Sequence, residues 1–180
     1  MSPVTLLLPL ILAWSLNQAQ EPANAPREAA DQVNPAEASP DAGQVTPELV
    51  KLWRKQAAEG EAHAQTNLGV LYSTGNGVPH DPRTAIKWFR KSAEQGDGFG
   101  QLMLATKYLE GDGVTRDPVR GWAWAILAAE AAADDEDAPP PDTSADDLRK
   151  TFEKDLTPAE VKQVEQLATE LRKKIEARRR

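Results

Sequence analysis

Residues 60–93 read GEAHAQTNLGVLYSTGNGVPHDPRTAIKWFRKSA, and residues 96–129 read GDGFGQLMLATKYLEGDGVTRDPVRGWAWAILAA. A shift of 36 positions (96 minus 60) aligns the two stretches with no insertion or deletion. A fixed period of this size, with helical patterning on both sides of a glycine turn, is typical of stacked helical hairpins. The sequence therefore predicts an all-α fold, an α-solenoid of antiparallel helix pairs with about two full repeats. The positions that keep one residue type in both stretches are Gly60 and Gly96, Gln65 and Gln101, Leu68 and Leu104, Tyr72 and Tyr108, Gly75 and Gly111, Gly77 and Gly113, Val78 and Val114, Asp81 and Asp117, Pro82 and Pro118, Trp88 and Trp124, and Ala93 and Ala129.

Each repeat carries its own signals for ending one helix and beginning the next. In the first repeat, a helix over 61–74 is followed by Gly75 and Gly77, and glycine adopts the left-handed backbone of a helix C-terminus without steric cost. Asp81 and Pro82 then suit the N-cap and the first position of a second helix. The second repeat has the same residues one period later, so we expect the same hairpin twice.

Helices are also expected on both sides of the repeats, as caps. Thr46 and Pro47 can begin a helix that matches the second half of a leading repeat. At the other end, residues 144–180 predict two helices, and the basic residues that close the chain could oppose the helix dipole or attract anionic lipid. The last helix could pack on the final repeat or pair with a second chain, and its short length favours packing within the chain. Its apolar seam consists of Val161, Val164, Ala168, Leu171 and Ile175.

The chain divides into five segments by composition. Residues 1–19 contain an apolar run, VTLLLPLILAWSL, whose length suits a secretory signal better than a bilayer span. Residues 20–45 are rich in Ala, Pro, Glu and Gln and predict a disordered linker. The repeat array then covers 46–133, an acidic proline-rich linker 134–143, and the capping helices 144–180. We therefore expect export to a bacterial periplasm or to the medium, with membrane contact only through an uncleaved signal segment.

Composition disfavours several classes of function. The net charge of −7 argues against nucleic-acid binding, which needs clustered lysine and arginine. The absence of cysteine excludes disulfides, thiolate metal sites and cysteine nucleophiles, and only His63 and His80 are present as histidines. No nucleophile with a paired acid and base is apparent in the sequence. We expect no metal site, no cofactor and no enzymatic activity.

The residues of the first repeat resemble the Sel-one-like repeat family, a relative of the tetratricopeptide repeats. In the second copy, Gly100, Ala105 and Gly121 stand where the first has Ala64, Gly69 and Ala85, which keeps these positions small. The resemblance extends from about residue 46 to 174 and is specific for fold rather than for function. The matching pattern is Ala64, Gln65, Leu68, Gly69, Tyr72, Gly75, Gly77, Val78, Asp81, Ala85, Trp88, Ala93 and Gly96.

The resemblance implies a right-handed superhelix that serves as an adaptor or scaffold and binds another protein or peptide on its concave face. If Leu68 and Tyr72 point into the core, the opposite face of each first helix is a candidate contact surface. Phe99, Leu102 and Leu109 are larger there than exposure to solvent favours, and exposed apolar clusters commonly mark contact sites. The alternative is that terminal helices already cover this face. The candidate contact residues are His63, Thr66, Val70 and Ser73 in the first repeat, and Phe99, Leu102, Thr106 and Leu109 in the second.

Two other functions remain open at this point. Some members of the family have been described as hydrolases of cell-wall-like substrates, so the resemblance also allows a cell-wall-active enzyme or accessory. A structural homodimer closed by the C-terminal helix is the third possibility. The sequence identifies neither the partner nor the pathway.

Overall fold

The computed structural model of the chain describes residues 45–134 and 145–179. Within these residues the fold is all-helical, with no strand, which confirms the predicted fold class. The helix boundaries agree with the capping residues read from the sequence. The helices are α3 (Pro47–Glu59), α4 (Ala62–Thr74), α5 (Pro82–Ala93), α6 (Gly98–Glu110), α7 (Pro118–Asp134), α8 (Ala145–Asp155) and α9 (Pro158–Arg179).

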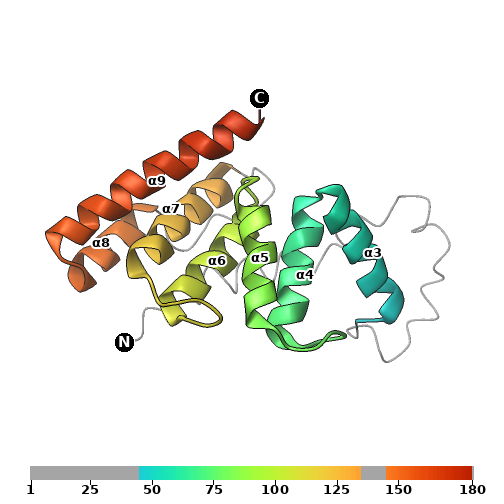
Figure 1. The fold of residues 1–180 in the computed structure, drawn as a ribbon. Coiled ribbons are helices and arrows are strands. Elements are labelled where there is room, and N and C mark those ends of the chain that lie inside the picture. The colour runs from blue at the N-terminus through green and yellow to red at the C-terminus, as the bar shows by residue number, and fades with distance from the viewer. Residues whose placement is uncertain (1–44, 135–144, 180) are drawn as a thin grey trace, which may run out of the picture.

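The helices from α3 to α7 form a stack in which each helix packs on the next (Figure 1). The pair α4 and α5 is the first repeat, and the pair α6 and α7 is the second. α8 and α9 both pack on α7 and close the array at its C-terminal end (Figure 1). The chain is therefore an α-solenoid of antiparallel helix pairs.

The two corners have the same backbone geometry. α4 ends at Gly75, with φ of 75°, and α6 ends at Gly111, with φ of 79°. The left-handed conformation at these positions is the one that glycine adopts without strain. Beyond each corner, the N–H of the capping aspartate donates to the carbonyl oxygen of the preceding tyrosine, over 2.8 Å for Asp81 and Tyr72. The equivalent bond in the second repeat measures 2.9 Å.

α3 occupies the place of a second repeat helix, as the sequence indicates. Its Arg54 donates from Nη2 to the Tyr72 hydroxyl over 3.5 Å. One period later, Arg90 of α5 donates to the Tyr108 hydroxyl over 3.0 Å. The same arginine–tyrosine contact thus joins α3 to the first repeat and the first repeat to the second.

α9 is held within its own chain. Val164, Ala168 and Ile175 are 0%, 3% and 7% exposed and belong to the main core cluster. The Phe152 ring of α8 lies against the Trp122 ring of α7, with centroids 5.8 Å apart. These seam residues are therefore buried inside one molecule, where a coiled coil with a second chain would require them to face outward.

Several predicted segments fall outside the described residues. The signal 1–19 and all of the linker 20–45 except Val45 lie there, and so does the acidic linker 134–143 apart from Asp134, which ends α7. Among the helices of residues 45–134 and 145–179, none is long and apolar enough to cross a membrane.

Candidate partner-binding site

Half of the eight predicted contact residues lie inside the molecule. Thr66, Leu102, Leu109 and Thr106 are 1%, 2%, 2% and 8% exposed. The prediction that they line an open face is therefore wrong for these four. It assumed one buried stripe on helix 98–110, whereas α6 has neighbours in α4, α5 and α7. A helix enclosed in this way buries residues around most of its circumference.

Leu109 is covered because of a glycine on the next helix. A Cβ atom placed on Gly121 of α7 would lie 2.6 Å from Leu109 Cγ. One period earlier, the two positions hold Ala85 and Ser73, a larger residue opposite a smaller one. The second repeat therefore accommodates leucine on α6 through glycine on α7, and the leucine belongs to the core.

The other four predicted residues reach the surface to different extents. The His63 side chain is 63% exposed, while Val70, Ser73 and Phe99 are half-buried. Val70 and Phe99 pack against the main core cluster. A partner-binding role for these four stays a prediction.

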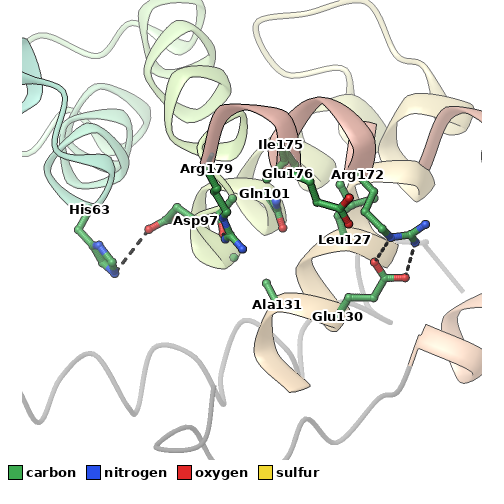
Figure 2. A pocket seen from close by; sticks show the side chains of 12 residues that line it. His63, Asp97, Gln101, Leu127, Glu130, Ala131, Arg172, Ile175, Glu176 and Arg179 are labelled. Carbon is green, nitrogen blue, oxygen red and sulfur yellow. Dashed lines mark hydrogen bonds and ion pairs between the residues drawn. The ribbon is translucent and has the colours of Figure 1, made fainter. Parts of the chain in front are cut away.

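A cavity of about 630 Å³ lies where both repeats meet α9 (Figure 2). Its wall comes from the start of α4, the turn into α6, the last turns of α7 and the C-terminal turns of α9. Only His63 among the eight predicted residues contributes to it. The lining residues are His63, Gly96, Asp97, Gly98, Gln101, Leu127, Glu130, Ala131, Arg172, Ile175, Glu176 and Arg179.

Asp97 is a buried carboxylate at the wall of this cavity, with its side chain 2% exposed. It caps α6 by accepting from the Gly100 N–H at 2.6 Å, and it accepts from the Thr66 hydroxyl at 3.1 Å. The second carboxylate oxygen lies 3.5 Å from His63 Nε2 (Figure 2). Thr66 therefore holds the Asp97 carboxylate in place, but it is itself too deeply buried to contact a partner.

Gln101 is a second buried polar residue in the wall, 2% exposed. Its Nε2 donates to the Ala93 carbonyl oxygen over 3.3 Å, just as Gln65 donates to Ala57 over 3.2 Å one period earlier. The repeated bond fixes the orientation of the amide. Gln101 Oε1 is buried and has no hydrogen-bond partner among the described residues. Such an unpaired acceptor costs free energy unless a donor reaches it.

Arginines of α9 bind the two repeats at equivalent glutamates. Arg172 contacts Glu130 through Nε at 3.1 Å and Nη2 at 2.5 Å (Figure 2). Arg178 donates to Glu94, one period earlier, over 2.8 Å. The hydrogen bonds that Arg172 donates to Glu130 raise the pKa of its guanidinium above the ordinary value. These arginines of the basic C-terminal end therefore attach α9 to the array.

The site contains no arrangement typical of a hydrolase. Asp97 contacts His63, but the nearby hydroxyl of Ser92 is 0% exposed and hydrogen-bonds Thr66 over 2.7 Å. A nucleophile has to reach both its general base and the substrate. In the described part of the chain, no group of three His, Asp or Glu residues could hold a metal ion.

Sequence reasoning missed most of the cavity wall. Asp97 and Gln101 are separated by about 70 to 80 positions from the arginines of α9, and no local pattern connects them. One signal was available: Gln65 and Gln101 are identical across the period, which points to a shared structural bond.

The Sel1 repeat family model matches residues 62–97 and 98–132. None of the curated proteins matches the chain. Among solved structures, the chain is similar to a protective antigen of uropathogenic Escherichia coli strains that displays an SLR fold. The two share 36% identity with a TM-score of 0.60, over 71% of this chain and 26% of that one.

The chain is also similar to a Sel1 repeat protein from Oxalobacter formigenes, with 31% identity and a TM-score of 0.44, over 46% of this chain and 34% of that one. The alignments thus span well under two thirds of either relative. The matched repeats coincide with the α4–α5 and α6–α7 pairs of the solenoid. The chain therefore contains two Sel1 repeats, and two closing helices follow them.

Proposed function

We propose that this chain is an exported scaffold that binds a protein partner, and that the cavity against α9 takes part in the contact. Sel1 repeat proteins are generally scaffolds for protein interactions, and this chain carries two such repeats. The observation that carries the proposal is the cavity itself. It combines two buried polar side chains, Asp97 and Gln101, with apolar lining residues, and the exposed His63 lies at its wall.

This combination is typical of a recognition site. Concave sites bind by apolar contact and gain specificity from a few fixed polar groups. Asp97 is held by the α6 backbone and by Thr66, so its carboxylate is oriented before any partner arrives. Preorganisation of this kind reduces the ordering cost of association.

A photo-crosslinking amino acid at position 63 tests the proposal in the native host. His63 is suited to replacement because its side chain is exposed and lies at the cavity wall. The matched control is Lys87, which is exposed on α5 and does not line the cavity. We expect a discrete cross-linked protein from position 63 and none from position 87. Equal cross-linking at both positions, or none at either, would contradict the proposal.

Export is tested separately. The apolar run from Val4 to Leu16 is the basis for it. Residues 1–45 fused to a reporter that is active only outside the cytoplasm should give activity. Leu8→Arg in the same fusion should abolish that activity, because a charge interrupts the apolar run. Reporter activity that survives this substitution would refute a signal role for the segment.

A further inference from the structure

One difference between the two repeats lies in the wall of the cavity. In the first repeat, Gln65 Oε1 accepts a hydrogen bond from Gln95 Nε2 at 2.9 Å. Gln101 is the equivalent of Gln65, and the equivalent of Gln95 is Ala131, since 95 plus 36 is 131. Alanine has no amide to donate, and Ala131 lines the cavity together with Gln101. The second repeat thus lacks the side chain that satisfies the glutamine oxygen in the first.

We propose that the cavity binds a side-chain carboxamide, from a glutamine or asparagine of a partner polypeptide, at the place that Gln95 fills in the first repeat. The carboxamide NH₂ donates to Gln101 Oε1. This inference rests on the proposed function and names the group by which the partner is recognised.

The lining of the cavity carries charges of both signs, which suits a neutral group with both a donor and an acceptor. The guanidinium groups of Arg172 and Arg179 lie in the same wall as the carboxylates of Asp97, Glu130 and Glu176, so an ion of either sign would meet repulsion as well as attraction. A carboxamide carries no charge. Its NH₂ serves the unpaired oxygen, and its carbonyl can accept from a guanidinium, which has five donors.

Entry of the group requires a side chain to move, because solvent does not reach Gln101 Oε1 in this arrangement. Arg179 is the side chain suited to this. It belongs to the last turn of α9, is exposed, and donates from Nη2 to the Gly96 carbonyl oxygen over 3.2 Å. Rotation of an exposed arginine leaves the core intact and is fast compared with binding.

The test uses the full chain, labelled for NMR, and two probes. The first is Nα-acetyl-glutamine methylamide, and the second is the glutamate analogue, which has the same shape but bears a carboxylate. We expect saturable shifts of the Gln101 side-chain NH₂ and of the Asp97 amide with the glutamine probe. The glutamate probe should bind at least about tenfold more weakly than the glutamine probe, because it lacks the NH₂ donor and adds a charge. Equal binding of the two probes, or no shift with either, would overturn the inference.

Two variants locate the effect. Ala131→Gln supplies the missing amide from within the chain, so it should abolish probe binding and raise the melting temperature. Ala133→Gln is the matched control, since residue 133 is exposed on the same helix, and it should bind the probe as the wild type does. Undiminished binding by a folded Ala131→Gln protein would refute the site. If neither probe binds while cross-linking at position 63 persists, this inference fails and the scaffold function stands.

Discussion

Gly69 and Phe89 form a close helix contact in the first repeat, and we predict that the effect of Gly69→Ala on stability changes sign when Phe89 is removed. Gly69 lies on α4 and Phe89 on α5, where the ring is 0% exposed. A Cβ on residue 69 would lie 2.5 Å from Phe89 Cδ1 and 3.0 Å from Cζ. Both distances are shorter than an ordinary van der Waals contact, so the methyl group would clash with the ring, and the enclosed ring has no room to move aside.

The magnitude follows from two opposed contributions. Forcing an extra methyl group into a packed core costs about 1–3 kcal/mol, while alanine is favoured over glycine inside a helix by about 1 kcal/mol. Gly69→Ala should therefore destabilise the wild type by up to about 2 kcal/mol. Phe89→Ala alone should cost about 3–5 kcal/mol. In that background the clash is absent, so Gly69→Ala should stabilise by up to about 1 kcal/mol.

The wild type, the two single variants and the double variant are unfolded in urea as full-length proteins, and unfolding is followed by circular dichroism. The four free energies of unfolding give the coupling between the two sites. Ala105→Gly is the matched control. Residue 105 is the equivalent of 69, and the residue equivalent to Phe89 is Ala125, so the control loses helix propensity without relieving any clash. If Gly69→Ala destabilises equally with and without Phe89, the packing argument is refuted.

Three further predictions concern α9 and the caps. Arg172→Met should cost less than about 1 kcal/mol, since the Arg172 and Glu130 side chains are 40% and 37% exposed. Ile175→Ala should destabilise the protein by about 2–4 kcal/mol. If Arg172→Met had the lower urea midpoint of the two variants, the inference that apolar contacts hold α9 would be contradicted. The Thr84 hydroxyl and N–H hold the pKa of Asp81 below its ordinary value, so this stabilisation is complete above pH 3.8 and is lost as pH falls through the lower folded-state pKa. Asp81→Asn keeps a cap that does not titrate. The variant should be less stable than the wild type at neutral pH, and this difference in the free energy of unfolding should shrink as pH falls. A difference that stays constant with pH would contradict a contribution from Asp81 ionisation. Sedimentation should give a monomer because the α9 seam is buried within the chain, and a dimer at micromolar concentration would contradict this expectation.

The fold could be predicted from the sequence because its determinants are local. A glycine at each corner and an aspartate–proline pair at each restart fix where helices end and begin, whatever the helices later pack against. Asp81 does cap α5, accepting from the Thr84 N–H over 3.1 Å. Thr46 caps α3 in the same way, accepting from the Leu49 N–H over 3.2 Å.

The buried faces could not be predicted equally well, because burial depends on the neighbours of a helix. The spacing of Leu109 along its own helix predicts an exposed apolar residue. In the structure it is buried because it packs against Gly121 of α7. The cavity depends on even more distant elements. Its wall joins the first turn of α6 to the last turn of α9, which ends at Arg179. Sequence periodicity describes each helix and does not place one terminal helix across two repeats.

Some of the differences between the repeats occur as compensating pairs. The first repeat sets a glycine, Gly69, against the large ring of Phe89, and the second has alanine at both positions, 105 and 125. Leu109 shows the same exchange in the opposite sense, because glycine faces it on α7. Paired changes of this kind keep the volume between two helices nearly constant, as close packing requires.

The exchange of Gln95 for Ala131 has no such partner. The glutamine that it served is kept, as Gln101, with its bond to Ala93 intact and its oxygen unpaired within residues 45–134 and 145–179. The bond to Ala93 is a structural reason to keep the glutamine, but it leaves the side-chain oxygen unsatisfied, and a buried polar group without a partner is unfavourable. The absence of a compensating change beside the cavity is the pattern expected when stability is given up locally for recognition. The uncompensated difference is therefore what leads us to propose this cavity as the binding site, whereas the compensated differences concern packing alone.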